Sequence, residues 1–280
     1  MKRLRACLPV LCALLASIAA ADEDESLAVV QERGVLKVAV YEAFPPFSDR
    51  DADGTPRGID VDIAHELARR LGLTATIRFQ PADESVEDDL RNAVWKGHYI
   101  GGGVADVMLH VPADPRFVAT VEQVRIDGVY YMEDIALAYA QAVFDGAPTL
   151  ASFTSHRVGV ELETIADLYL LSTMNGALRD NVAHYPALAR ATAALVEGEI
   201  PAVMGHRAEL EGLLHGHAGI AVTKVAIPGV MISSWPLGAA VKAGDVALGD
   251  AVMGHLKAMV DDGTVARIFA AHGATPTPGG

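Results

Sequence analysis

Aromatic side chains lie at the end of the apolar segment 35–41 and just after it, where they could line a binding site for a small molecule. Residues 35–41 are mostly apolar and β-branched, which is typical of a buried strand. The prolines in residues 44–47 cannot continue this strand, because proline fixes φ and donates no backbone hydrogen bond. A loop therefore begins at the carboxyl end of the strand, the edge at which open α/β sheets bind ligands. We expect Tyr41 and Phe44 to line one wall of such a site.

Three histidines lie close together in the sequence and could bind a metal ion: His206, His215 and His217. The side chains of His215 and His217 would share a face only in a strand, whereas residues 213–217 are typical of a helix end. At a helix C-terminus, a protonated histidine interacts favourably with the helix dipole. A metal site stays the minor alternative, and we expect neither a metal nor a cofactor. Glu161, Glu163 or His206 could supply an acid, but the spacing of residues in the sequence does not identify a nucleophile, a base and an orienting group. We therefore expect no enzyme.

The elements that would position these residues alternate between strand and helix. Residues 59–71 have apolar side chains at i and i+4, with Gly72 just past the end, which predicts a helix. Residues 73–79 alternate as a strand does, and residues 81–95 predict a helix with acids near its start. A further strand is predicted at 105–110, another enters a helix at 164–171, and helices are predicted at 185–196, 206–214, 245–260 and 264–271. This alternation predicts an α/β fold.

Two segments fit no regular element. Residues 96–103 end in three consecutive glycines and predict a loop. That loop could be simply flexible, or it could contact a ligand or partner through Trp95, His98 and Tyr99, since long irregular loops are often functional. Residues 275–280 contain prolines and glycines and predict a loose tail.

The first 21 residues have the pattern of a cleavable secretory signal peptide. Three basic residues precede an apolar stretch at 6–20, which is too short for a comfortable membrane span, and three alanines end at Ala21. We expect cleavage near Ala21 and a periplasmic location; a retained membrane anchor is the alternative. Both cysteines of the chain lie in this segment, so the mature protein would be held by hydrophobic burial without disulfides.

The charge of the chain narrows the choice of partners. The formal net charge is −14 for all 280 residues, and it becomes −17 when the three basic residues of the signal segment are removed. A strongly acidic protein does not bind nucleic acid or an anionic membrane through its overall field. We expect a small-molecule partner and a monomer, with no nucleic acid.

Several short blocks in order along the chain resemble the extracellular solute-binding proteins of family 3, which serve polar amino acid uptake. The blocks are GIDVDI at 58–63, GVE at 159–161, GEIPAV at 198–203, LGAAVK at 237–242 and DGTVARI at 262–268. The resemblance implies an α/β, two-lobed type II periplasmic-binding-protein fold with two hinge strands. It places lobe 1 at residues 22–134 and 241–280 and lobe 2 at 135–240, with hinge segments near 134–140 and 235–241.

The resemblance also implies a binding site between the lobes. Arg116 occupies the position of an arginine that holds a ligand carboxylate as a bidentate fork, and His110 or Val111 replaces a threonine hydroxyl. In the second lobe, Glu161 and Glu163 occupy a turn that is usually glycine-rich, and the helix that starts at Thr164 corresponds to one whose N-terminus helps to hold an anionic group. His206 replaces an aspartate that accepts hydrogen bonds from an α-ammonium group. We therefore expect an ordinary α-amino acid to bind weakly.

Three functions fit these observations. The first is a periplasmic receptor of an ABC-type transporter that closes its two lobes on a small polar, carboxylate-bearing solute and presents it to a permease. The second is an accessory protein of a PQQ-dependent alcohol dehydrogenase, because residues 91–94 and 106–113 resemble receptor-like proteins that accompany these quinoproteins. The third and minor alternative is an enzyme, since exported dehydratases of prephenate-like acids resemble this family.

Overall fold

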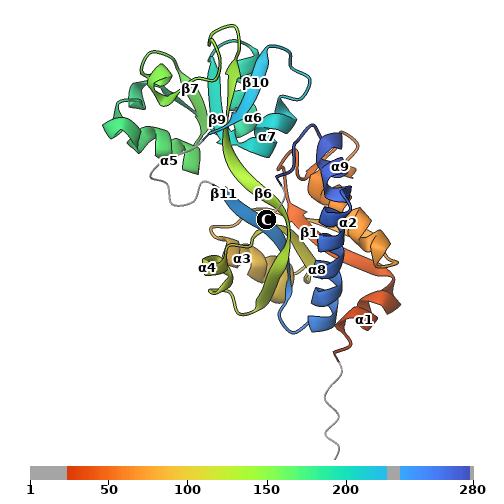
Figure 1. The fold of residues 1–280 in the computed structure, drawn as a ribbon. Helices are drawn as coiled ribbons and strands as arrows, with labels where there is room; N and C mark the ends of the chain where they lie inside the picture. Colours follow the sequence, from red (N-terminus) through yellow and green to blue (C-terminus); the bar gives the residue numbers. More distant parts are fainter. Residues whose placement is uncertain (1–23, 226–233, 278–280) are drawn as a thin grey trace, which may run out of the picture.

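The computed structural model describes residues 24–225 and 234–277, which form two lobes joined by long strands (Figure 1). The predicted signal peptide at 1–21 lies outside these residues. The strands are β1 (Val35–Tyr41), β2 (Asp49–Arg50), β3 (Pro56–Arg57), β4 (Thr74–Gln80), β5 (Val107–Pro112), β6 (Val124–Ala140), β7 (Val158–Glu161), β8 (Val182–Tyr185), β9 (Ala202–His206), β10 (Ile220–Lys224) and β11 (Ser234–Lys242). The main α-helices are α1 (Ser26–Arg33), α2 (Ile59–Arg70), α3 (Val86–Leu90), α4 (Pro115–Val118), α5 (Ile165–Ser172), α6 (Leu188–Val196), α7 (Arg207–Leu213), α8 (Val246–Asp261) and α9 (Thr264–Ala271). None of the helices in the described ranges is both long enough and apolar enough to cross a membrane.

The first lobe is a sheet covered by helices on both faces. Its strand order is β4-β1-β5-β11-β6, and β1 pairs in parallel with both β4 and β5. One core packs β1 against α2, α8 and α9, and a second core packs the other face against α3 and the π-helical turn that follows it. The apolar β1 and the regular stripe of α2 fit this two-sided burial. The predicted α/β fold class is confirmed.

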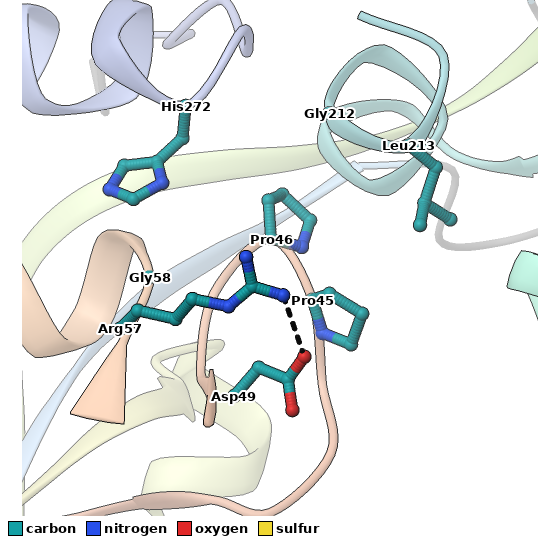
Figure 2. Close-up of a pocket in the computed structure, with 8 residues that line it drawn as sticks. All are labelled: Pro45, Pro46, Asp49, Arg57, Gly58, Gly212, Leu213 and His272. Carbon is teal, nitrogen blue, oxygen red and sulfur yellow. Dashed lines mark hydrogen bonds and ion pairs between the residues drawn. The ribbon is translucent and has the colours of Figure 1, made fainter. Parts of the chain in front are cut away.

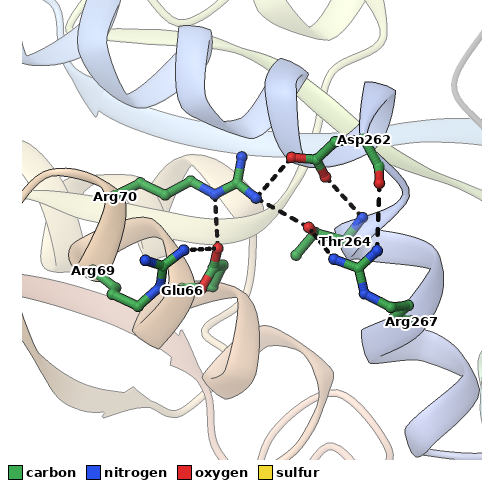
Figure 3. A network of polar contacts seen from close by, with 6 residues as sticks. All are labelled: Glu66, Arg69, Arg70, Asp262, Thr264 and Arg267. Carbon is green, nitrogen blue, oxygen red and sulfur yellow. Dashed lines mark hydrogen bonds and ion pairs between the residues drawn. The ribbon is translucent and has the colours of Figure 1, made fainter.

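A polar network within this lobe connects helix α2 with the segment 262–267, which is far from it in the sequence. Arg70 of α2 donates to Glu66 at 2.7 Å, to Asp262 at 2.8 Å and to Thr264 at 3.0 Å, as Figure 3 shows. Arg267 of α9 donates to the same threonine at 2.7 Å. The guanidinium of Arg70 therefore bridges two helices that are nearly 200 residues apart in sequence. This contact helps to close a lobe built from two separate segments.

The second lobe has its own sheet, in which β7 pairs in parallel with β8 and β9. The prediction of a helix over 185–196 is wrong at its start, because Tyr185 ends strand β8 and α6 begins only at Leu188. The four residues Val182–Tyr185 are too few to show a strand pattern by themselves. Their pairing with β7 is a tertiary contact, which overrides local propensity.

Two strands run between the lobes. The 17-residue strand β6 pairs with β11 through residues 124–134 and with β9 through residues 135–139, so one strand belongs to both sheets. Figure 1 shows β6 and β11 side by side at the waist of the molecule. The register of β11 shifts between Leu237 and Ala239 and so accommodates Gly238, where a Cβ atom would lie 2.5 Å from a carbonyl oxygen of β6. These strands are the hinge elements of the two-lobed fold.

The C-terminal segment differs from the predicted loose tail. Residues 274–277 leave α9 and contact the second lobe: the backbone N–H of Thr275 donates to Glu211 at 2.6 Å, and Arg207 donates to the carbonyl oxygen of Thr275 at 2.8 Å. The backbone N–H of Met132 on β6 also donates to the carbonyl oxygen of Thr277 at 3.1 Å. The prediction is therefore wrong for residues 275–277, because a polar sequence gives no sign of partners that are distant in the chain.

Candidate functional site

A cavity of about 310 Å³ lies where the two lobes meet the crossing strands. Its walls come from the loop after β1, from the end of β5, from both crossing strands and from the end of β9 in the second lobe. The lining residues are Tyr41, Glu42, Ala43, Phe44, Ala82, Val86, His110, Pro112, Glu133, His206, Trp235 and Leu237. This volume is within the range of small-molecule sites. Four residues predicted from the sequence, Tyr41, Phe44, His110 and His206, are brought together here.

Two aromatic rings form the first-lobe wall. The hydroxyl of Tyr41 donates to Asp89 at 2.8 Å, and its ring meets Phe44 edge to face with 6.2 Å between the centroids. Burial, followed by the nearby negative charge of Asp89, raises the pKa of the Tyr41 hydroxyl far above its ordinary value. This hydroxyl therefore stays protonated and fixed, and Tyr41 offers its ring to the cavity.

His110 is oriented by a buried network beneath this wall. Its Nδ1 lies 3.1 Å from Asp60, which is fully buried and also accepts from the Tyr130 hydroxyl at 2.7 Å. The backbone N–H of His110 donates to the same hydroxyl at 2.9 Å. The backbone of His110 has φ +63°, a left-handed conformation that strains a residue with a side chain, at a register shift between β5 and β11. The surrounding bonds hold that conformation and direct the imidazole to the cavity.

Glu133 on β6 contributes a buried carboxyl group to the cavity wall. The residue is 1% exposed, and its Oε1 accepts from the backbone N–H of Asp134 at 2.9 Å and from the Tyr131 hydroxyl at 3.1 Å. Its Oε2 has no hydrogen-bond partner among the described residues. Burial raises the pKa of Glu133 above its ordinary value, against the opposing effect of His206.

His206 ends β9 and faces the hinge. Its Nδ1 lies 2.7 Å from Glu209, and its ring meets Trp235 of β11 edge to face at 5.4 Å between centroids. Burial would lower the pKa of His206, but Glu209, Glu133 and Glu161 outweigh this effect and raise the pKa to about 9. His206 is therefore an imidazolium near pH 7, held by carboxylates of its own protein.

Two predicted residues of the second lobe line a separate, smaller space. Glu161 and Thr164 border a notch of about 10 Å³ that shares only His206 with the main cavity. Glu161 accepts from the backbone N–H of Leu188 at 3.2 Å, and Thr164 caps α5 by accepting from the backbone N–H of Asp167 at 3.3 Å. A space of this size holds about one water molecule. Ligand binding by Glu161 and Thr164 stays a prediction.

Arg116 lies outside the cavity. It is exposed on the short helix α4, and its backbone N–H donates to Asp114, which caps that helix. No lysine or arginine is among the residues that line the cavity. The role of Arg116 as a carboxylate anchor stays a prediction, and no contact in the described residues connects its side chain with this cavity.

Sequence reasoning did not select Glu133, Trp235 or Asp60 as site residues. A signal for Glu133 was present, because Glu133 and Asp134 are consecutive acids within an apolar run of hinge-strand composition. Adjacent residues of a strand point to opposite faces, so at least one of these acids had to be buried. Buried acids are uncommon unless they are paired or functional.

A second cavity of about 310 Å³ lies on the other side of the loop at 44–47. Figure 2 shows its wall of Pro45, Pro46, Asp49 and Arg57 from the first lobe opposite Gly212 and Leu213 of α7. Arg57 donates to Asp49 at 3.2 Å, and both side chains are partly exposed. This cavity has fewer buried polar groups than the hinge cavity, so we place the candidate site at the hinge. In the parts of the chain that the structure describes, no three His, Cys, Asp or Glu side chains are placed to hold a metal ion.

Comparisons with known proteins agree with the fold. Residues 36–95 match the family model of bacterial extracellular solute-binding proteins, family 3. The L-cystine-binding protein TcyJ of Escherichia coli (strain K12) is 41% identical over 49 residues, which are 18% of each chain. Cyclohexadienyl dehydratase of Pseudomonas aeruginosa is 43% identical over 65 residues, 23% of this chain and 24% of that one. The chain thus matches about a fifth to a quarter of the length of these curated relatives.

Solved structures extend the likeness to nearly the whole chain at the level of fold. An ancestral cationic amino acid solute-binding protein has a TM-score of 0.71 at 20% identity, covering 89% of this chain and 99% of that one. An amino acid ABC transporter substrate-binding protein of Streptococcus pneumoniae, bound to L-arginine, has a TM-score of 0.62 at 20% identity, with 90% and 99% covered. The chain thus shares the two-lobed fold of these solved structures over nearly its whole length, and over residues 36–95 it is similar to the bacterial extracellular solute-binding proteins, family 3.

Proposed function

We propose that the protein is a receptor that binds a small polar solute in the cavity at the hinge. The observation that carries this proposal is the position of the cavity: its walls come from both lobes and from both crossing strands. A solute held there contacts every part that moves when two lobes close about hinge strands, so binding and closure are coupled. Tyr41, Phe44, His110 and His206 are the predicted residues that this geometry supports as ligand contacts, and Glu133 and Trp235 join them.

We infer the cellular role of the protein from its similarity to this family. We infer that the protein works in the periplasm, after cleavage of the signal peptide near Ala21, and delivers its solute to the permease of an ABC-type transporter as a monomer. The assignment of lobe 1 to residues 22–134 and 241–280 and of lobe 2 to residues 135–240 belongs to this proposal. The predicted carboxylate on the solute rests on Arg116, which receives no support from the cavity lining.

Thermal stability tests the receptor proposal directly. The purified protein is heated with amino acids, carboxylates, diamines and PQQ, each added separately. A solute at roughly 100 times its Kd adds about 2.7 kcal/mol to the free energy of unfolding, which is roughly 5 to 10 °C in Tm for a chain of this size. Phe44→Ala should remove the shift, whereas Met174→Ala, at an exposed second-lobe position outside the cavity lining, should keep it. If the same shift survives Phe44→Ala, the solute binds elsewhere.

The accessory role beside a PQQ-dependent alcohol dehydrogenase is the second candidate. It is favoured by the loop that precedes the three glycines, where Tyr99 is 91% exposed and Ile100 is 77% exposed. Large apolar side chains that are this exposed are common at protein interfaces. Co-elution with a purified PQQ-dependent alcohol dehydrogenase would support this role, provided that the double change Tyr99→Ser and Ile100→Ser abolishes it.

A dehydratase activity is the minor alternative. Its support is the partial similarity to a cyclohexadienyl dehydratase, together with the protonated His206 and the buried acid Glu133 at the cavity. Incubation with a prephenate-like acid, followed by its ultraviolet spectrum, tests this activity. Unchanged acid after prolonged incubation with the folded protein would exclude it for that substrate.

A further inference from the structure

The lining of the hinge cavity contains two acidic residues, and the imidazolium of His206 in the same lining is already paired with Glu209. Glu42 lies at its exposed mouth and Glu133 in its buried wall, and the lining contains no lysine or arginine. The two histidines of the lining are already engaged by carboxylates. His110 lies 3.1 Å from Asp60, and His206 lies 2.7 Å from Glu209. A solute carboxylate entering this cavity would meet like charges and would have to compete with these carboxylates for the imidazole rings.

Glu133 has a free hydrogen-bond acceptor at the point where the lobes meet. Its Oε1 already accepts two hydrogen bonds, from Asp134 and Tyr131, whereas its Oε2 has none among the described residues. Leaving a buried acceptor without a partner costs about 1 to 3 kcal/mol in a typical protein, so such an atom calls for an explanation. A donor supplied by a bound solute would remove this penalty. The strongest such donor is a protonated amine, since charge-assisted bonds are about twice as strong as neutral ones.

The remaining walls suit the body of an organic cation. The hydroxyl of Tyr41 is occupied by Asp89, so its ring is what Tyr41 presents, next to the ring of Phe44. Trp235 also lines the cavity, with its ring against His206. Aromatic faces attract cations through the quadrupole of the ring, and they also bury apolar carbon atoms. A volume of about 310 Å³ accommodates a body of about one aromatic ring with a short chain.

We propose that the solute of this cavity is a small organic amine with an apolar, ring-sized body and no α-carboxylate, and that Glu133 selects it by accepting from the ammonium group. This inference rests on the proposed receptor function and adds to it the chemical class of the solute. An α-amino acid of the same body binds more weakly, because its carboxylate lies among acids with no arginine or lysine in the lining. The corresponding acid, which lacks the amine, binds least.

Calorimetric titration with three probes that share one body tests this order. The probes are 2-phenylethylamine, L-phenylalanine and 3-phenylpropionate, and each is titrated into the purified protein at pH 7. We expect the amine to bind at least tenfold more tightly than the amino acid, with no measurable binding of the acid. A cavity that binds the amino acid or the acid more tightly than the amine overturns the inference and leaves the receptor function standing. If the protein binds none of the three probes and no compound of the thermal-shift panel, both the inference and the receptor function are overturned.

Glu133→Gln tests the role of the carboxylate itself. Glutamine keeps the size of the side chain and the acceptor at Oε1, and it replaces the unpartnered Oε2 by a donor that repels the ammonium group. We expect this variant to weaken binding of 2-phenylethylamine by at least tenfold. Glu122→Gln, an exposed change outside the cavity, should leave it unaltered. Equal binding by Glu133→Gln and the unaltered protein overturns Glu133 as the selecting residue, and the ranking of the three probes on the unaltered protein tests the solute class even if this variant fails to fold.

Discussion

At the scale of single residues, His206 has an unusual charge state because of its neighbours. Burial opposes its protonated form, but three carboxyl groups, Glu209, Glu133 and Glu161, favour that form and outweigh the burial. A group whose pKa is higher in the folded than in the unfolded protein stabilises the fold at pH values below the unfolded value. That contribution is lost as the pH rises through the folded value.

The stability of the protein should therefore fall between pH 6.5 and about 9 as His206 loses its proton. The full contribution of this residue is at most roughly 3 kcal/mol, because a difference of one between the folded and unfolded pKa corresponds to about 1.4 kcal/mol. Urea unfolding at intervals from pH 6 to pH 10 measures the slope. His206→Gln should flatten it, whereas His65→Gln, at an exposed position of α2, should not. A slope that is the same in both variants would assign the pH dependence to another group.

The buried network beneath His110 gives a second prediction at this scale. The hydroxyl of Tyr130 donates to Asp60 at 2.7 Å and accepts from the backbone N–H of His110 at 2.9 Å. Tyr130→Phe leaves both partners unsatisfied in a buried place, so we expect the free energy of unfolding to fall by about 1 to 3 kcal/mol. Tyr99→Phe removes the same hydroxyl at an exposed position and should change it by less than about 0.5 kcal/mol. Denaturant unfolding of both variants makes the comparison, and equal stability would contradict the network.

At the scale of the elements, the approach of α7 to the first lobe depends on a glycine. A Cβ atom on Gly212 would lie 2.7 Å from Cγ of Pro46, closer than packed atoms allow. Figure 2 shows Gly212 of α7 near Pro46, and both residues line the second cavity. The glycine thus permits contact between a helix of one lobe and a loop of the other.

Two glycine-to-alanine changes separate this contact from helix propensity. Gly254 lies within α8, and a Cβ atom there meets nothing within 4 Å, so Gly254→Ala should stabilise the protein by about 0.5 to 1 kcal/mol. Gly212→Ala gains the same propensity but forces α7 away from Pro46, so it should give no gain or a loss. Thermal unfolding compares the two, and small-angle scattering should show a larger radius only for Gly212→Ala. An equal gain in stability in both variants would mean that the loop containing Pro46 moves to accommodate the added methyl group at little cost.

The elements also show how far the sequence could predict this molecule. The apolar run of β1 and the apolar stripe of α2 are patterns within a single segment of the sequence. The predicted bounds of these two elements therefore agree with the structure to within one or two residues. Strand β8 depends on pairing with β7, which no local pattern encodes. The same holds for the site: Tyr41 and Phe44 follow from the end of β1, but Glu133 lines the cavity only because β6 crosses between the lobes. The role of Arg116 rests on a resemblance to a motif, which gives a position along the chain but not the direction of the side chain relative to a cavity.

At the scale of the whole molecule, the C-terminal segment is a third connection between the lobes. It leaves α9 of the first lobe, and Arg207 and Glu211 of α7 bind it at Thr275. Arg207 also donates to the hydroxyl of Thr277. Because β6 and β11 are the other connections, we expect the angle between the lobes to depend on this segment as well as on the hinge strands.

Arg207→Ala should loosen this connection without touching the cavity lining. Removing the guanidinium deletes the donors to the carbonyl oxygen of Thr275 and to the hydroxyl of Thr277, and the loss of such charged hydrogen bonds costs about 1.5 to 3 kcal/mol each at most. We expect faster amide hydrogen exchange in residues 274–277 and a lower free energy of unfolding. Arg190→Ala, an exposed change on α6, should alter neither. Unchanged exchange in this segment would show that Glu211 and β6 hold it without Arg207, and the lobe angle would then depend on the hinge strands and on those remaining bonds.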